Sequence, residues 1–382
     1  MLRLSIPFEK VKNWLLSSGL FVNNNNDKNC GAVYSFYNEK KKEFCFLYPE
    51  ITGYFLSALR FLYDIEKNRN YLEYSKLSAN WLVSIYDKYG GIIQGFSLDS
   101  AKKELIYSFD TAICAKGLLD SFVITGEEKY LEYAKKMIWY LTDEALENDG
   151  SVKPYKNLKT NEFEESKDVW YKRKGCFHIK TAIPFIQLYE ITNDRRLFEN
   201  AVKILNTYSK YQNPDGSFNL HQNDKVINLH TLCYALEGLL FGYQVTKNDN
   251  YLKSCSDAAN WCAEKIENDG SINLWFNSKY KSKAAYSVAQ LIRIMILLSS
   301  LNKNDIYKKN VDKLHSFQIL LQAVTNDPKI DGGFYEELYK FAFNWKKRPR
   351  LNSWTSMFAL QSLYWFENYH EIAFDKASKS LY

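Results

Sequence analysis

Several residues that can carry protons stand where apolar, helix-like stretches of the sequence begin. Carboxylates, imidazoles and phenols are the side chains that most often act as general acids and bases in enzymes. The candidate catalytic residues of this kind are Glu50, Tyr54, Asp110, His230, Tyr335 and Glu336. Their types and positions predict acid–base chemistry carried by side chains.

Aromatic, amide and basic residues accompany them at the same helix starts. Free backbone N–H groups and the positive end of the helix dipole favour anionic ligands at such places. Arg adds a planar fork that matches a carboxylate or a phosphate. The candidate substrate-binding residues are Tyr48, Tyr107, His178, Lys180, Tyr286, Arg348, Arg350, Asn352 and Trp354.

Each of these positions also has a purely structural explanation. Pro49 and Glu50 are suited to starting a helix, and Asp110 is suited to capping one. The basic aromatic loops 170–174 and 344–350 also have the composition of solvated loops. Cys176 and His178 stand close in the sequence, but no further metal ligands are recognisable, so we predict no metal and no cofactor.

A repeated pair of helices must position these residues. Four segments share an apolar helix, a short polar turn and a second helix, at 58–82, 117–141, 185–208 and 238–262. The turns contain Asn, Asp, Gly or Lys, which suit the end of one helix and the start of another. The pattern predicts helical hairpins that repeat every 50 to 70 residues or so.

A glycine motif follows the second helix of each hairpin. Copies stand at 89–91, 149–152, 215–218, 269–272 and 331–334, and we interpret 18–21 as a degenerate sixth copy. Gly at these points can take the left-handed conformation that ends a helix. A helix at 7–18 then serves as a second helix that completes the last hairpin.

The first helices of the hairpins are the more apolar set. We expect them to begin at Gly53, Asp110, Lys180, His230, Ser287 and Trp354. A helix that is apolar nearly all round is buried, so these six predict an inner ring within an outer one. The predicted fold is all-α: a closed α/α toroid of six hairpins, in one domain spanning 1–382. An open solenoid of helix pairs is the alternative.

Composition excludes several classes of protein. The net charge of +6 arises from 50 basic and 44 acidic residues without a concentrated basic block, so we predict no nucleic-acid partner. No apolar run is long enough to span a membrane, and no secretory leader is recognisable. Seven scattered cysteines argue against a disulfide framework. We therefore expect a cytoplasmic protein, and the oligomeric state stays open, a homodimer included.

Two motifs carry a resemblance to known families. The segment 212–218 (QNPDGSF) looks like the Gln-x-x-Asp-Gly-Ser-aromatic motif of squalene-cyclase-type repeats. The segments 47–54 and 352–361 look like parts of proteins from bacterial polysaccharide-synthesis clusters. The whole repeat pattern resembles the six-hairpin toroids of carbohydrate-active enzymes, including glucuronyl epimerases of the heparosan type.

That resemblance implies an enzyme acting on a saccharide that contains uronic acid. The expected reaction is an epimerisation or a lyase-type proton abstraction beside the sugar carboxylate. Arg348 or Arg350 would hold that carboxylate. Tyr54 and Tyr335 would carry protons, with Glu50 or Glu336 tuning or replacing one of them. Glycoside hydrolysis by paired carboxylates is the alternative reaction, and a saccharide-binding scaffold without catalysis is the alternative function.

Overall fold

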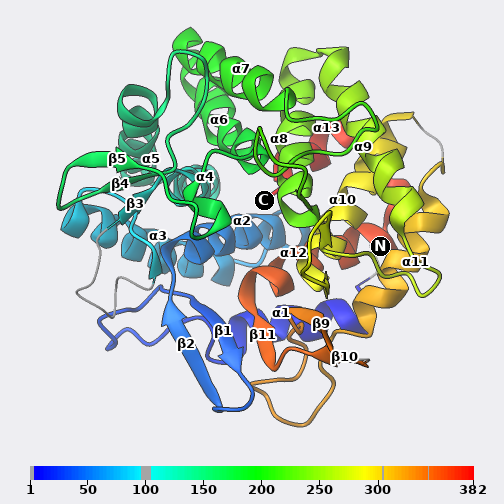
Figure 1. Cartoon of the computed structure of the whole chain (residues 1–382). Helices are drawn as coiled ribbons and strands as arrows, with labels where there is room; N and C mark the ends of the chain where they lie inside the picture. The colour runs from blue at the N-terminus through cyan, green and yellow to red at the C-terminus, as the bar shows by residue number, and fades with distance from the viewer. Residues whose placement is uncertain (1–3, 96–104, 303–304, 343) are drawn as a thin grey trace. The chain divides into compact units, whose positions relative to one another are not determined.

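The computed structural model describes residues 4–95, 105–302, 305–342 and 344–382. Most of this chain is helical (Figure 1). The α-helices are α1 (Ile6–Ser17), α2 (Pro49–Glu66), α3 (Asn70–Tyr89), α4 (Ser108–Thr125), α5 (Glu128–Tyr140), α6 (Ala182–Thr192), α7 (Arg195–Ser209), α8 (Leu229–Thr246), α9 (Asp249–Lys265), α10 (Ala285–Asn302), α11 (Lys308–Ile319), α12 (Ser353–Glu367) and α13 (Phe374–Ala377).

Short strands, which the all-α prediction did not include, form in the loops between helices. They are β1 (Tyr34–Asn38), β2 (Glu43–Leu47), β3 (Leu105–Tyr107), β4 (Tyr155–Asn157), β5 (Glu162–Glu164), β6 (Ile227–Asn228), β7 (Trp275–Phe276), β8 (Ser282–Ala284), β9 (Glu337–Phe341), β10 (Asn344–Lys347) and β11 (Arg350–Asn352). β3, β6, β8 and β11 each end directly before α4, α8, α10 and α12. The strands therefore hold the starts of these helices.

The first helix of each hairpin is the more buried one, as predicted. Every residue from Ser108 to Ser121 of α4 and from Leu229 to Gly242 of α8 is buried. The second helix α7 instead buries one stripe: Leu197, Asn200, Ala201, Ile204, Leu205 and Tyr208. This spacing of three and four residues is that of an amphipathic helix with one face toward the core.

The described residues divide into two compact units. The α2–α7 unit takes residues from 21–35, 45–210 and Tyr382, and the α8–α13 unit, which also contains α1, takes residues from 1–20, 36–44 and 211–381. That the whole chain is one domain stays a prediction.

In the α2–α7 unit, α2 and α4 cross at two glycines. A Cβ atom at Gly117 would lie 2.5 Å from the carbonyl oxygen of Gly53, and one at Gly53 would lie 3.0 Å from the Cα atom of Cys114. The distance at Gly117 is shorter than any side chain allows, so this position requires glycine, and the contact at Gly53 is tighter than most Cβ contacts. α4 also contacts α6, which places three first helices in sequence.

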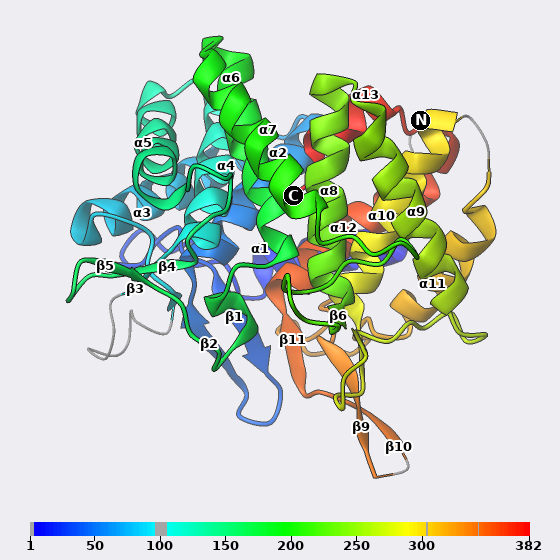
Figure 2. The same cartoon turned by 45° about the horizontal axis from the view of Figure 1, so that its top comes forward.

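In the α8–α13 unit, α10 contacts α8 and α12 as well as α9 and α11 (Figures 1 and 2). α1 packs against α12. The indole Nε1 of Trp14 donates to the carbonyl of Lys329 (2.9 Å), and Gln322 Nε2 donates to the carbonyl of Pro7 (2.9 Å). The helix predicted at 7–18 therefore exists as α1 and contacts α12, while its role in completing the last hairpin stays a prediction.

Glycines in four of the predicted loops pack against the backbone of the following second helix, whereas Gly90 and Gly91 of the 89–91 copy do not. Gly150, Gly216, Gly270 and Gly332 have positive φ, and an added Cβ would lie 2.0–2.5 Å from a backbone oxygen of α7, α9, α11 and α1, respectively. The predicted sixth copy at 18–21 is wrong, because the equivalent glycine is Gly31. Its Cβ would lie 2.1 Å from the carbonyl oxygen of Leu77 on α3, and Val33 bridges Phe21 as Phe218 bridges Gln212.

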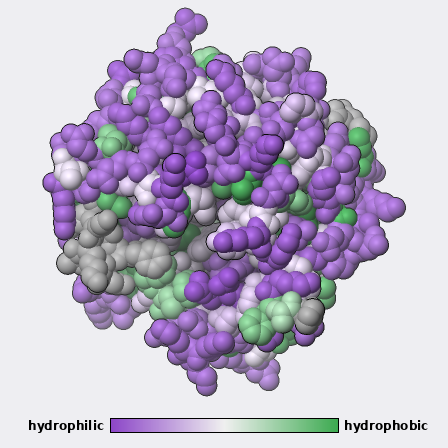
Figure 3. All heavy atoms as spheres, in the orientation of Figure 1, coloured by the Kyte–Doolittle hydropathy of each residue, from purple (hydrophilic) through white to green (hydrophobic). Residues whose placement is uncertain are grey.

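The face of the molecule in Figure 3 is largely hydrophilic, with hydrophobic residues in small separate groups. Among the described residues, every helix is too short or too polar to cross a membrane.

Candidate active site

The hydroxyl of Tyr48 lies between two carboxyl groups in the α2–α7 unit. Tyr48 Oη donates to Asp110 Oδ2 (3.3 Å) and also hydrogen-bonds Glu50. Gln94 Nε2 lies 3.5 Å from the same hydroxyl and donates to it. Three of the predicted site residues therefore form one hydrogen-bonded cluster, which we call the carboxyl cluster (Tyr48, Glu50 and Asp110).

The helix starts explain how these residues meet. Pro49 begins α2 and places Glu50 in the first turn, and Asp110 stands in the first turn of α4. The glycine crossing of α2 and α4 brings these two first turns together. Cys114 Sγ, one turn along α4, donates to the carbonyl of Pro49 (3.3 Å) and ties the two starts to each other.

Burial changes the acidity of both carboxyl groups. Burial raises the pKa of Glu50 to about 7, although the hydrogen bond from Tyr48 and the charge of Lys180 both lower it. Burial also raises the pKa of Asp110 well above its ordinary value, and the neighbouring charge of Glu50 raises it further. At neutral pH the pair therefore holds a proton that an exposed pair of carboxylates would release.

A lysine and a second tyrosine lie beside the cluster. Lys180, in the 3-10 helix Cys176–Thr181, is buried, and its Nζ lies 5.0 Å from the ring centroid of Tyr54. Tyr54 is itself only 1% exposed. The structure thus places the predicted proton carrier Tyr54 beneath a buried cation.

Two other predicted residues of this unit lie in aromatic packing. Tyr107 is buried on β3, with its ring centroid 5.5 Å from that of Tyr155 and 5.9 Å from that of Tyr171. His178 is fully buried, with its ring centroid 4.3 Å from that of Phe177.

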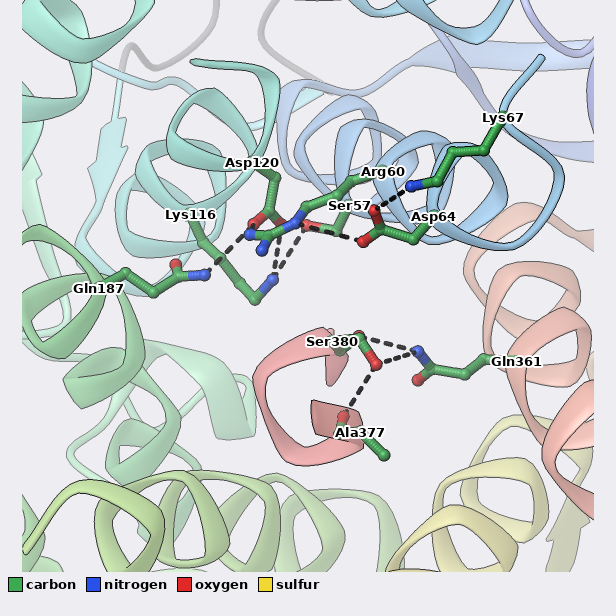
Figure 4. Close-up of polar contacts among 10 residues, drawn as sticks. All are labelled: Ser57, Arg60, Asp64, Lys67, Lys116, Asp120, Gln187, Gln361, Ala377 and Ser380. Atoms are coloured by element: carbon green, nitrogen blue, oxygen red, sulfur yellow. Dashed lines mark hydrogen bonds and ion pairs between the residues drawn. The ribbon is translucent and has the colours of Figure 1, made fainter. Parts of the chain in front are cut away.

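A further buried group of charges lies deeper along α2 and α4 (Figure 4). Asp120 accepts hydrogen bonds from Arg60 Nη1 (2.6 Å), Lys116 Nζ (2.7 Å) and Gln187 Nε2 (3.2 Å). Burial would raise the pKa of Asp120, but the charges of Lys116 and Arg60 outweigh it and lower the pKa. This group joins α2, α4 and α6 and is separate from the predicted site residues.

The α8–α13 unit contains a second cluster around His230. His230 Nδ1 lies 2.6 Å from Gln290 Oε1, and its ring centroid lies 4.7 Å from that of Tyr286. The Tyr286 ring in turn lies 6.4 Å from that of Trp354. Burial raises the pKa of Tyr286 well above its ordinary value, and the charges of Glu337 and Glu336 raise it further.

Glu336 and the two predicted arginines form one charged group near Tyr286. Arg348 binds Glu337 Oε1 through Nη2 (2.5 Å) and Nε (2.7 Å). Arg350 Nη1 lies farther from its partner, 3.9 Å from Glu336 Oε2. Burial and the charge of Glu337 raise the pKa of Glu336 to about 7, while both arginines lower it.

Two predicted residues of this unit have partners of their own. Tyr335 Oη donates to Glu39 Oε1 (3.0 Å). Asn352 is fully buried and caps α12, where its Oδ1 accepts from the N–H of Thr355 (3.1 Å).

Sequence reasoning missed Gln94, Gln290 and Glu237. Gln94 lies in a loop and carries no signal that the sequence alone offers. Glu237 does carry one, because it is a lone acid in an apolar helix and stands seven residues, or two turns, after His230. Gln290 stands four residues after Tyr286 on α10 and shares its face.

Within the described ranges, no group of three or more His, Cys, Asp or Glu side chains is placed so that it could hold a metal ion.

No protein-family model matches the sequence, and no curated protein matches it either. Among solved structures, the chain is similar to a cellobiose 2-epimerase from Bacillus thermoamylovorans, with 14% identity and a TM-score of 0.76 over 96% of this chain and 99% of that one. An unsaturated glucuronyl hydrolase specific for heparin is 12% identical, with a TM-score of 0.70 over 96% and 98%. An inactive alpha-1,6-mannanase from a Salegentibacter species, in complex with alpha-1,6-mannotriose, is 13% identical, with a TM-score of 0.62 over 95% and 99%.

At these identities the likeness shows the fold. It confirms the six-hairpin α/α toroid fold predicted from the repeats.

Proposed function

We propose that this protein is a carbohydrate-active enzyme that moves protons to and from a saccharide. The observation that carries the proposal is the single Tyr48 hydroxyl between Glu50 and Asp110, two carboxyl groups whose pKa values burial raises. The names of several solved proteins of the same fold state that they act on or bind saccharides. This supports a saccharide as the substrate class.

Within this class we propose an epimerase or a lyase. Glu50, with a pKa of about 7, is protonated in a large fraction of molecules near neutral pH and serves as the general acid. A group whose pKa lies near the working pH is the most effective proton carrier. Asp110 and the Tyr48 hydroxyl hold the proton that Glu50 gives up and regains.

We further propose that the sugar carries a carboxylate. Arg350 is the residue we nominate to bind it, because Arg348 is already held by two short contacts to Glu337, whereas Arg350 is 3.9 Å from Glu336. The side chain of Arg350 is 42% exposed, so it is accessible to a ligand. An Arg beside the developing enolate-like charge stabilises the transition state of proton abstraction.

Incubation with a uronate polysaccharide in heavy water tests this function. Deuterium should enter at the carbon that bears the carboxylate, and Glu50→Gln should suppress its entry by about 100- to 10,000-fold, the usual contribution of one acid–base group. Arg350→Ala should mainly weaken binding of the uronate, while Arg173→Ala, at a basic residue outside the described contacts of Glu336, serves as the matched control.

Glycoside hydrolysis is the second candidate, favoured by the presence of two neighbouring carboxyl groups of raised pKa. Release of reducing ends without deuterium at carbon would replace the epimerase proposal with this one. A third outcome is that the parent protein binds saccharide but converts none, and that Glu50→Gln binds it equally well. This outcome would support the saccharide-binding scaffold without catalysis.

A further inference from the structure

A chain of buried hydrogen bonds runs inward from His230 in the α8–α13 unit. His230 Nδ1 and Gln290 Oε1 are 2.6 Å apart, and Gln290 Nε2 donates to Glu237 Oε1 (3.3 Å). Arg293 Nη2 donates to the same Glu237 oxygen (2.5 Å), and its Nη1 donates to Gln361 Oε1 (2.8 Å). Figure 4 shows the far end of this chain, where Gln361 Nε2 donates to the carbonyl of Ser380 (2.8 Å).

The direction of every bond in this chain follows from Arg293. A guanidinium only donates, so Glu237 Oε1 accepts from Arg293 and is also the acceptor facing Gln290. Gln290 must then turn its NH2 group to Glu237 and its carbonyl oxygen to the imidazole. A carbonyl oxygen accepts a hydrogen bond, so His230 Nδ1 must carry a proton.

Burial indicates that this chain serves the histidine rather than stability. Gln290, Glu237 and Arg293 are all 0% exposed, whereas His230 is 8% exposed. A buried ion pair is weak evidence for stability, because apolar side chains of similar volume often serve a core at least as well. Of these four side chains, His230 is the one with exposed surface, so the buried groups lead to a side chain that a ligand can reach.

Aromatic rings hold the imidazole in place. The ring centroid of His230 lies 4.1 Å from that of Tyr234 and 6.4 Å from that of Phe358, in addition to its contact with Tyr286. The imidazole is thus packed among three aromatic rings in tilted and edge contacts and is bonded at Nδ1 to Gln290.

We infer that Gln290, Glu237 and Arg293 are positioning residues that hold His230 as the Nδ1–H tautomer, so that Nε2 is a proton acceptor in the catalysed reaction. The catalytic part of this inference rests on the proposed function. In the neutral Nδ1–H imidazole the lone pair lies on Nε2. That lone pair forms a bond to the proton beside the sugar carboxylate, and the electron pair of the broken C–H bond moves onto the carboxylate. Gln290 Oε1 accepts from Nδ1–H throughout and stabilises the imidazolium that forms.

Nitrogen NMR of the whole protein tests the tautomer without any substrate. With 15N-labelled histidine at pH 8, the His230 signals, assigned by their loss in His230→Gln, should show Nδ1 protonated and Nε2 unprotonated. Gln290→Leu should move His230 toward the Nε2–H form. The control Gln318→Leu removes another fully buried glutamine of this unit, bonded to Ser362 Oγ (2.8 Å), and should leave the His230 signals unchanged. A parent protein with Nε2–H at His230 overturns the inference, whether or not the variants fold.

Kinetics test the catalytic part. Gln290→Leu should lower kcat for deuterium incorporation by about 100- to 10,000-fold, as loss of a correctly oriented base does, with KM nearly unchanged. Gln318→Leu should keep kcat within a few-fold. Equal kcat in Gln290→Leu and the parent overturns the positioning role while leaving the proposed function intact. A third outcome separates the two proposals. If the parent shows the Nδ1–H tautomer and Gln290→Leu loses it, but the parent exchanges no saccharide proton, the tautomer assignment is supported and the proposed function is rejected.

Discussion

A tyrosine hydroxyl has one proton to donate, so Tyr48 cannot donate to Glu50 and Asp110 at the same time. The two carboxyl groups and the phenol are therefore satisfied together only when one carboxyl is protonated and donates in its turn. This requirement agrees in direction with the raised pKa values of both carboxyl groups. The cluster therefore keeps a proton near neutral pH.

The pH dependence of turnover should report Glu50. If its protonated form is the general acid, kcat/KM falls as the pH rises through about 7, the raised pKa of Glu50. Glu50→Gln should remove this alkaline limb together with most of the activity. A pH–rate profile of the parent and the variant checks the prediction, and an unchanged limb in Glu50→Gln would assign it to another group.

Tyr48→Phe should move that limb to higher pH. The hydrogen bond from Tyr48 lowers the pKa of Glu50, so its removal lets burial raise the pKa further. The same profile measures the shift. Tyr63→Phe, a tyrosine on the last turns of α2, is the control, and a limb displaced to lower pH in Tyr48→Phe would contradict the argument.

The candidate residues could be predicted one by one, but their grouping could not. Tyr48, Glu50 and Asp110 attract attention by type and by place at helix starts, yet only the crossing of α2 and α4 makes them one cluster. Arg348 also attracts attention as a free cation in the sequence. Its ion pair with Glu337 depends on the β9–β10 hairpin, which the local sequence pattern did not predict.

At the scale of the elements, the hairpins were predictable because each is encoded locally by an apolar run, a polar turn and a glycine. The strands were not, because their partners lie far along the chain: β1 pairs Phe36 with Asn352 of β11. The glycine after α1 was misplaced for a related reason. Gly19 follows the helix at the expected spacing, but Gly31 is the one that reaches α3.

Gly117→Ala tests the close crossing of α2 and α4. Its Cβ would lie 2.5 Å from the Gly53 carbonyl oxygen, so the helices must separate, at a cost of about 1–3 kcal/mol. A shift of this kind at the carboxyl cluster should lower kcat by roughly 100-fold. Gly126→Ala is the control, because a Cβ there meets nothing within 4 Å and only its φ of +71° is unfavourable. Equal losses of kcat in both variants would show that kcat does not depend on the close approach of α2 and α4.

Asp120→Asn tests the buried charges of α2, α4 and α6. The change leaves the buried Lys116 without its counter-charge and Arg60 with only the more distant Asp64 (Nε to Oδ2, 3.8 Å), and should lower the free energy of unfolding by about 3–5 kcal/mol. Asp143→Asn removes one partner of an exposed ion pair with Arg196, with side chains 60% and 52% exposed, and should cost less than about 1 kcal/mol. Urea denaturation of the two variants makes the comparison, and similar losses would contradict it.

At the scale of the whole molecule, α1 packs against α12, a helix that begins more than three hundred residues later. The backbone N–H of Ser5 donates to Glu367 Oε2 (2.9 Å), and Lys10 Nζ lies 2.8 Å from Asp331 Oδ1. These contacts lie entirely within the α8–α13 unit.

Trp14→Ala should therefore destabilise the α8–α13 unit. Trp14 is 1% exposed, and its loss leaves a cavity and an unpaired carbonyl at Lys329, at a cost of about 3–5 kcal/mol. Trp345→Ala, at a tryptophan 37% exposed on β10, should cost much less. Thermal unfolding followed by circular dichroism compares the two, and an unaffected Trp14→Ala would exclude a structural role for the α1 contact.

The pairing of α1 with α12 also sets an order of events during synthesis. Ribosomes add about 5–20 residues per second, so α1 leaves the exit tunnel roughly 20–70 s before α12 has been translated. Throughout this interval Phe8, Val11, Trp14 and Leu15, the buried face of α1, have no partner. Between the synthesis of α1 and that of α12, the nascent chain thus exposes an apolar helix face, and we expect that face to favour contacts with other apolar surfaces until α12 emerges.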